Sequence, residues 1–316
     1  MIGKIRKNFK ELISVNSFGA RFSILLLLVK LLPQKYSTAI NTKRIKEVQK
    51  WIYKFYNDRP LAENTNVSAN EKNKNIWFFW WQGVENAPDT IKMCLNSLKV
   101  HFNKDVIVIT KDNYMEYTNI NKNTLDKFIK GKITITHFSD ILRFNLLSEH
   151  GGLWLDSTII ATGECDYIFD KAFWTINRSY DHSLVCVSEC KWNISFLYGS
   201  GIFFDTVKEM LDVYWSVNDC MIDFFLIDYI VDYLYQTDIN VKNMIDAVSI
   251  SNRDVYDLSK KMNHKFDTSD FAQLTNTTQL HKLNWRDAYV PSIEGHETYY
   301  GYLSRKYTAI KRGDEK

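Results

Sequence analysis

The spacing of hydrophobic and polar residues predicts strands and helices that alternate along most of the chain. Residues 76–81 form a short run rich in aromatic side chains, which is too short for a helix and predicts a buried first strand. A helix is predicted from the Ala87-Pro88 pair to about residue 102, because proline is tolerated in a first turn, and residues 105–110 predict a second strand. This order indicates a parallel sheet with a right-handed crossover.

The rest of the chain continues the pattern and predicts an α/β fold. Further helices are predicted over residues 121–130, 139–150, 206–215, 222–235 and 298–310. Further strands are predicted over residues 153–155, 172–177, 184–188 and 278–283.

The first 65 residues differ from the rest and predict a separate N-terminal helical segment. The apolar run at residues 23–32 follows a basic stretch and ends at Pro33; its ten residues are too few to span a bilayer, which needs about 20. For residues 1–32 two interpretations stay open: a helix packed on the main domain, or an interfacial helix on anionic lipid. A helix over residues 36–56 is expected to pack, and the polar residues 64–75 predict a linker.

Residues 137–158 carry the strongest chemical signal. Asp140 and Arg143 lie three positions apart in a predicted helix and therefore share a face. Gly151 and Gly152 supply the left-handed conformation that closes a helix, and the strand after them delivers Asp156 to the carboxyl edge of the sheet. Open α/β sheets bind their ligands at that edge. A turn-forming aspartate and an exposed ion pair would explain the same residues without a site.

The pattern Ser139-Asp140-x-x-Arg143, followed by a double glycine and a strand ending at Asp156, resembles the sugar-binding region of glycosyltransferase family 32 and of the clostridial glucosylating toxins, which are of GT-A type. The resemblance has one departure. Where the wider group has an Asp-x-Asp motif, this chain has Asp156-Ser157-Thr158, so that a hydroxyl replaces the second carboxylate.

Two further segments resemble the bacterial capsular polysaccharide synthesis protein family. Residues 80–88 read Trp-Trp-Gln-Gly-Val-Glu-Asn-Ala-Pro, and residues 281–285 read His-Lys-Leu-Asn-Trp. The similarity runs from about residue 76 to about residue 303. It implies a GT-A domain over residues 76–316, with a Rossmann-like mixed sheet flanked by helices.

The resemblance implies an enzyme that moves a hexose from a nucleoside diphosphate sugar, such as a UDP-sugar, to a lipid-linked oligosaccharide in capsular or exopolysaccharide synthesis, with retention of configuration. Mn²⁺ or Mg²⁺ is the expected cofactor, since the departing diphosphate needs a cation with oxygen ligands. A non-catalytic nucleotide-sugar binder and a sugar-phosphate transferase of the capsule pathway stay open as alternatives.

The resemblance also implies roles for individual residues. The expected metal ligands are Asp156, Thr158 and His281. The expected donor-binding residues are Trp80, Trp81, Gln82, Gly83, Ser139, Asp140, Arg143, Gly152, Lys282 and Trp285. The expected catalytic carboxylates are Asp140, Asp156, Asp223 and Asp228, the last two beside the acceptor.

Structural roles compete with several of these assignments. Trp80 and Trp81 could as well be core residues as donor-binding residues. Strand alternation would let only one of them face a pocket, and the pattern of the toxins favours Trp81. His281 could be a buried core histidine, while Asp223 and Asp228 could be cap or surface residues.

Composition narrows the class of protein. A chain of 316 residues suits one large α/β domain with additions, and a net charge of +3 is too small to indicate nucleic-acid binding. The five cysteines form no Cys-x-x-Cys pair, which indicates a reducing compartment. We therefore expect a cytoplasmic protein, with peripheral contact at the inner face of the membrane if residues 1–32 bind lipid.

Overall fold

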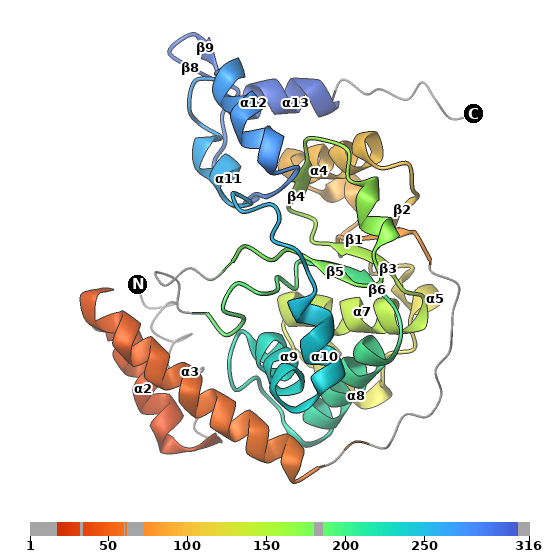
Figure 1. Cartoon of the computed structure of the whole chain (residues 1–316), viewed down its shortest axis with the longest axis vertical. Coiled ribbons are helices and arrows are strands. Elements are labelled where there is room, and N and C mark those ends of the chain that lie inside the picture. Colours follow the sequence, from red (N-terminus) through yellow and green to blue (C-terminus); the bar gives the residue numbers. More distant parts are fainter. Residues whose placement is uncertain (1–17, 32–33, 60, 62–72, 180–185, 309–316) are drawn as a thin grey trace.

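The computed structural model describes residues 18–31, 34–59, 61, 73–179 and 186–308, and its centre is a five-stranded mixed sheet (Figure 1). Strand β1 is parallel to β2 and β3, whereas β6 is antiparallel to β3 and β5. In sheet order the strands are β2 (Val106–Ile109), β1 (Ile76–Phe79), β3 (Gly152–Leu155), β6 (Phe196–Gly199) and β5 (Trp174–Thr175). This arrangement confirms the predicted α/β, Rossmann-like mixed sheet.

Helices cover both faces of this sheet, and two small sheets complete the fold (Figure 1). The helices are α2 (Ala20–Leu31), α3 (Gln34–Asn57), α4 (Asp89–His101), α5 (Tyr114–Tyr117), α6 (Lys122–Ile129), α7 (Ile135–Glu149), α8 (Ile202–Val217), α9 (Leu226–Thr237), α10 (Ile239–Asp246), α11 (Asp257–Lys261), α12 (Thr268–Thr277) and α13 (Tyr299–Thr308), with 3₁₀ turns at Val84–Asn86 and Asp166–Asp170. The small sheets pair β4 (Ile159–Ala161) with β7 (Leu280–Lys282), and β8 (Ser292–Ile293) with β9 (His296–Glu297).

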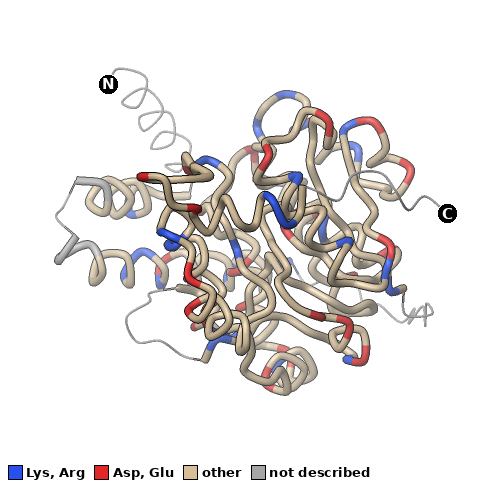
Figure 2. Tube along the Cα trace, turned by 90° about the horizontal axis from the view of Figure 1, so that it is seen from above, with Lys and Arg blue, Asp and Glu red and all other residues tan. Residues whose placement is uncertain are grey.

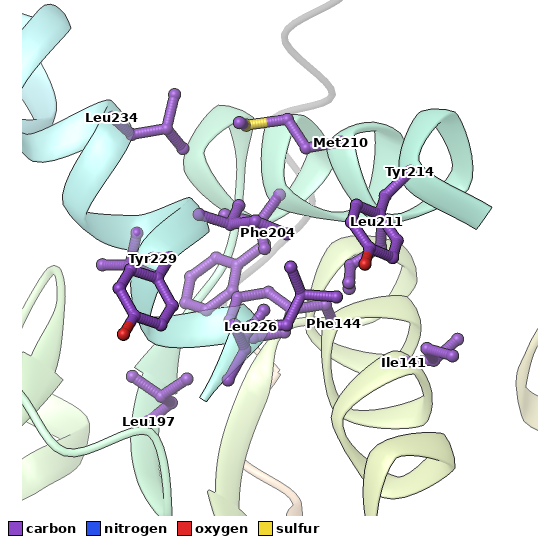
Figure 3. Close-up of a cluster of buried hydrophobic side chains, with 14 of the residues drawn as sticks. Ile141, Phe144, Leu197, Phe204, Met210, Leu211, Tyr214, Leu226, Tyr229 and Leu234 are labelled. Carbon is purple, nitrogen blue, oxygen red and sulfur yellow. The ribbon is translucent and has the colours of Figure 1, made fainter. Parts of the chain in front are cut away.

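Alternation along the strands divides the core into two layers. Trp77, Phe79 and Trp154 pack into the layer formed with α7, α8 and α9, while Ile76 and Phe78 point to the layer beneath α4. Each such side chain contributes about 1.5–3 kcal/mol when fully buried. Figure 3 shows the first layer, with labelled residues Ile141, Phe144, Leu197, Phe204, Met210, Leu211, Tyr214, Leu226, Tyr229 and Leu234.

The turn from α7 into β3 depends on its two glycines. Gly151 and Gly152 have φ of +67° and +102°, where side chains with a Cβ are disfavoured. A Cβ on Gly152 would lie 2.7 Å from the carbonyl oxygen of Asn75. The predicted helix stop is thus confirmed, whereas α7 begins four residues earlier than predicted, because the Thr134 side chain caps it by accepting from the His137 amide.

The sequence prediction was wrong or incomplete for several strands. Of the predicted strand 184–188, residues 184 and 185 lie outside the described residues, and residues 186–188 form no strand. Strands β4 and β6 were not predicted, although all their residues are buried. The predicted strand 172–177 shortens to the two residues of β5.

Helices α2 and α3 form a hairpin that packs beside α9 (Figure 1). Val48, Ile52 and Phe55 of α3 are buried in the same core layer as α8 and α9, as predicted for this helix. Within the described residues, no helix has the length and apolar character needed to cross a membrane. Residues 1–17 and most of the predicted linker lie outside the described residues.

Candidate functional site

A cavity of about 830 Å³ opens at the carboxyl ends of β1 and β3. Its volume lies within the range of small-molecule sites, and its place is where open α/β sheets bind ligands. Trp80 and Trp81 follow β1 and Asp156 follows β3, while β6 runs antiparallel and so brings Ser195 to the same edge. The Asp156 amide donates to the Ser195 carbonyl oxygen at 3.0 Å, which joins the two strand ends.

Arg143 links the α7 helix to the strand edge. One terminal nitrogen donates to Asp140 Oδ1 at 2.7 Å and the other to Asp156 Oδ1 at 2.9 Å. Its guanidinium lies 4.8 Å from the centre of the Trp154 ring, and its side chain is only 3% exposed. Arginine suits this position because one rigid fork of donors can hold two carboxylates at once.

His137 lies close to the other oxygen of Asp140. The indole of Trp215 donates to His137 Nε2 at 3.1 Å, which leaves Nδ1 facing Asp140 Oδ2 at 3.4 Å. Both His137 and Trp215 are buried. His137 Nδ1 makes no hydrogen bond to Asp140, so the hydrogen bond from Arg143 is what orients the Asp140 carboxylate.

Lys282 contacts the other oxygen of Asp156. Its Nζ lies 2.6 Å from Asp156 Oδ2 and donates to Ser195 Oγ at 3.0 Å, while the Trp154 indole donates to Asp156 Oδ1 at 2.9 Å. Burial alone would raise the pKa of the Asp156 carboxyl, but the charges of Lys282 and Arg143 hold that pKa far below its ordinary value. Asp156 is consequently ionised throughout the physiological range.

These residues do not form the predicted metal shell. His281 is fully buried on β7, its Nε2 lies 3.2 Å from Thr162 Oγ1, and burial lowers the pKa of its imidazole to about 4. It does not line the cavity, so the structure corrects its prediction as a metal ligand. Among the described residues no group of three or more His, Cys, Asp or Glu side chains could hold a metal ion. A divalent cation at a nucleotide site takes part of its oxygen ligands from phosphate and water, so one carboxylate could be enough. Here, however, both oxygens of Asp156 are already paired with cations, so Asp156 and Thr158 do not fit a tightly held divalent cation.

Both predicted tryptophans line the cavity, although alternation continues beyond β1: Trp80 packs with the layer of Phe78, and Trp81 packs with the layer of Phe79. Trp81 packs against Phe138 at 5.7 Å and Phe128 at 5.3 Å between ring centres. Trp80 meets Trp285 edge to face at 5.5 Å, so these two rings form one wall. The expectation that only one tryptophan faces the pocket is therefore wrong.

The remaining predicted donor residues divide into two groups. Gln82 and Ser139 line the cavity. Gly83 and Gly152 do not line it, and Gly152 serves the close approach of β3 to Asn75 described above.

Another part of the cavity wall is formed by α9 and the N-terminal hairpin. Asp228 lines the cavity and accepts a hydrogen bond from the Trp192 indole at 3.0 Å. Burial raises the pKa of the Asp228 carboxyl to about 7; the Trp192 hydrogen bond opposes this rise and the charge of Asp140 adds to it. Its protonation therefore changes near neutral pH.

Asp223 has a structural position instead. It is buried, does not line the cavity, and forms an ion pair with Arg44 of α3. Its Oδ1 also accepts from the Phe225 amide at 2.9 Å. Asp223 thus ties the hairpin to the segment before α9, which corrects its prediction as a catalytic carboxylate.

Sequence reasoning missed several residues of the cavity wall. Arg44 reaches it from α3, although no residue of the predicted N-terminal segment 1–65 was assigned to the site. Trp192 and Ser195 reach it from the segment before the unpredicted strand β6. The Arg44–Asp223 pair joins distant parts of the chain, and no local pattern indicates it.

The fold and this cavity define a Rossmann-like α/β protein with a ligand site at the carboxyl ends of its parallel strands. The model of the family described as capsular polysaccharide synthesis protein matches residues 29–303, so the chain belongs to that family. This membership indicates a role in capsule biosynthesis. A comparison with curated proteins gives no match.

Proposed function

We propose that the chain is a glycosyltransferase that moves a hexose from a nucleoside diphosphate sugar, such as a UDP-sugar, to a lipid-linked oligosaccharide in capsular or exopolysaccharide synthesis. The observation that carries this proposal is the linked set of Asp140, Arg143, Asp156 and Lys282 at the carboxyl edge of the sheet. Two cations and two carboxylates facing a cavity of about 830 Å³ suit a ligand with an anionic diphosphate and a hydroxyl-rich sugar.

In the proposed reaction the bond between the anomeric carbon and the β-phosphate oxygen breaks, and its electron pair stays on the phosphate. The acceptor hydroxyl oxygen bonds to the anomeric carbon, and its proton passes to the carboxylate of Asp228. A base with a pKa of about 7 is well matched to this task. Retention of configuration and the GT-A assignment rest on the resemblance to family 32, and retention requires the acceptor to attack from the face that the diphosphate leaves. No step is routed through a metal ion, since the donor set does not fit one.

Thermal-shift screening against UDP- and GDP-sugars, followed by product analysis, tests the proposal. We expect one sugar nucleotide to raise the melting temperature and to release the nucleoside diphosphate slowly when incubated with the protein. Release of the nucleoside monophosphate instead would identify a sugar-phosphate transferase. Stabilisation without any turnover, with lipid-linked acceptors present, would identify a non-catalytic binder, and no stabilisation by any sugar nucleotide would contradict the whole proposal.

The hairpin of α2 and α3 supports a proposal on where the acceptor is met. Ile24, Leu27 and Leu28 of α2 are 56%, 40% and 36% exposed. The groove between the two helices is lined by the basic residues Arg21, Lys43, Lys46 and Lys50, together with Ile24, Leu25 and Glu47. Apolar side chains beside basic ones suit the surface of an anionic membrane.

The two charge signs are interspersed over the rest of the described trace (Figure 2), so this local arrangement does not reflect a generally basic protein. Asn41, Arg44 and Ile45 of the same hairpin line the cavity. The hairpin would therefore hold the cavity beside the membrane that carries a lipid-linked acceptor.

Co-sedimentation with vesicles tests the membrane contact. The double substitution Leu27→Ser and Leu28→Ser should reduce binding to phosphatidylglycerol vesicles several-fold, because it removes exposed apolar surface. Val100→Ser is a matched control, since Val100 is an exposed apolar residue of α4. Equal binding by all three proteins would contradict the contact.

A further inference from the structure

We infer that the ammonium group of Lys282 takes the position of a divalent cation on Asp156, and that this donor site neutralises the departing diphosphate without a metal ion. The inference rests on the proposed function and goes beyond it, because it replaces the expected Mn²⁺ or Mg²⁺ by a residue of the chain.

The first observation is that both oxygens of the Asp156 carboxylate are already engaged. Oδ1 accepts from Arg143 and Trp154, each at 2.9 Å, and Oδ2 lies 2.6 Å from Lys282 Nζ. A divalent cation binds carboxylate oxygens at about 2.0–2.6 Å, so on Oδ2 it would share one oxygen with the ammonium group. Two cations so close repel each other strongly in a partly buried site. Metal binding at Asp156 would therefore require Lys282 to leave.

The second observation is that the cavity offers few other side chains that could bind a metal ion. Thr158 offers a neutral hydroxyl in place of the second carboxylate, and His281 is buried away from the cavity. Within the described residues no cluster of three metal-ligating side chains exists. A cation that displaced Lys282 would find one protein carboxylate and would depend on the diphosphate and water for its other ligands, while Asp156 would lose the ion pair that already satisfies it.

The third observation is that Lys282 is fixed in place with one donor to spare. Its backbone amide donates to the Val255 carbonyl at 2.7 Å, and β7 pairs it with Ile159 of β4. An ammonium group has three N–H donors; Asp156 and Ser195 take two, and the side chain lines the cavity at 25% exposure. The third N–H is available to a phosphate oxygen.

The charges of the cluster leave Lys282 as the cation nearest the donor. Asp140, Arg143, Asp156 and Lys282 together carry no net charge, and Arg143 is shared by the two carboxylates, whereas Lys282 pairs with Asp156 alone among them. When the anomeric bond breaks, the electron pair goes to the β-phosphate oxygen, and the ammonium group stabilises that charge by a charge-assisted hydrogen bond. Arg143 is buried and positions Asp156, whereas Lys282 is the group that would touch the leaving phosphate.

Calorimetric titration of the full chain with UDP and with GDP tests the inference, each in excess EDTA and again in Mn²⁺. We expect one nucleotide to bind with about the same dissociation constant in both buffers. Lys282→Met should weaken that binding about 10- to 100-fold, the effect of one charge-assisted hydrogen bond. Lys260→Met is the matched control, since Lys260 is an exposed lysine of α11 that pairs with Asp257, and the variant should bind as the unchanged chain does.

The outcomes separate the inference from the proposed function. Binding that appears only with Mn²⁺, or that Lys282→Met leaves unchanged, would overturn the inference and leave the glycosyltransferase proposal standing. Failure of both nucleotides to bind in either buffer would overturn the proposed function and the inference with it. The EDTA comparison uses the unchanged chain, so the metal question is decided even if Lys282→Met does not fold.

Discussion

Two carboxylates of the cavity, Asp156 and Asp228, lie in opposite electrostatic environments. Asp156 accepts from Arg143, Trp154 and Lys282, and its pKa is held far below the ordinary value. Asp228 has a hydrogen bond from Trp192, and burial raises its pKa to about 7. Carboxylates whose pKa values are pushed apart within one site commonly have different roles.

The difference indicates how the site divides its work. Asp156 cannot exchange protons near neutral pH, so its proposed part is to orient the cations that face the donor. Asp228 can exchange a proton near neutral pH, so its proposed part is to receive the acceptor's proton. Asp156 stays ionised because cations and donors surround it, whereas Asp228 has a raised pKa because few groups stabilise its charge.

The largest effect on stability and activity together should come from Arg143→Met, which removes the cation shared by Asp140 and Asp156. Asp140 and Asp156 would then face each other without the cation between them, a loss on the order of 3 kcal/mol in unfolding free energy. Transferase activity should fall about 10²- to 10³-fold, because the donor cluster loses its alignment. Urea unfolding and a transfer assay measure the two effects.

Arg143→Lys is the control that keeps the charge and loses the fork. It should recover part of the stability and little of the activity, since one ammonium group cannot hold both carboxylates in the same geometry. Stability unchanged by Arg143→Met would show that the linked cluster does not hold this part of the site together.

Asp228→Asn should affect activity and leave stability intact. Loss of a general base lowers the rate about 10²- to 10⁴-fold. In the folded protein Asp228 keeps its proton up to a pH of about 7, whereas an unfolded aspartate loses it at about pH 4. Asp228 therefore lowers the free energy of unfolding as the pH rises between those two values. At pH 8 the asparagine variant should be as stable as the unchanged chain or more so, as thermal unfolding can measure. A clear loss of stability would contradict the contrast with Arg143.

The fold could be predicted where local signals decide it. The α7 helix could be predicted from side-chain spacing, and its end from the double glycine, whose two φ angles are positive in the structure. Thr134, which caps the start of the helix, was overlooked. Strands β4 and β6 have only three and four residues, too few for a period to show. They are stabilised by pairing with distant strands, which the local pattern does not encode.

The cluster at the centre of the site could be predicted from the sequence, but the residues around it could not. The structure brings Asp140, Arg143 and Asp156 together, as helix spacing and the strand end suggested. His281 and Lys282 are neighbours in the sequence, but strand alternation sends one into the core and the other into the cavity. Which of the two faces inward depends on the pairing of β7 with β4, and the sequence alone could not decide it.

The smallest and most specific effect should come from Trp192→Phe. The Trp192 indole donates the hydrogen bond that opposes the rise in the pKa of Asp228, so its removal should raise that pKa further. If Asp228 acts as a base, transferase activity of the unchanged chain rises with pH through about 7. The variant's curve should have its midpoint about one pH unit higher, the effect of one hydrogen bond to a charged group in a partly exposed site.

The phenyl ring of the variant keeps the apolar packing, so activity well above the new midpoint should be close to that of the unchanged chain. A midpoint that does not move would mean that another group sets the pH dependence, and the division of roles between the two carboxylates would fail.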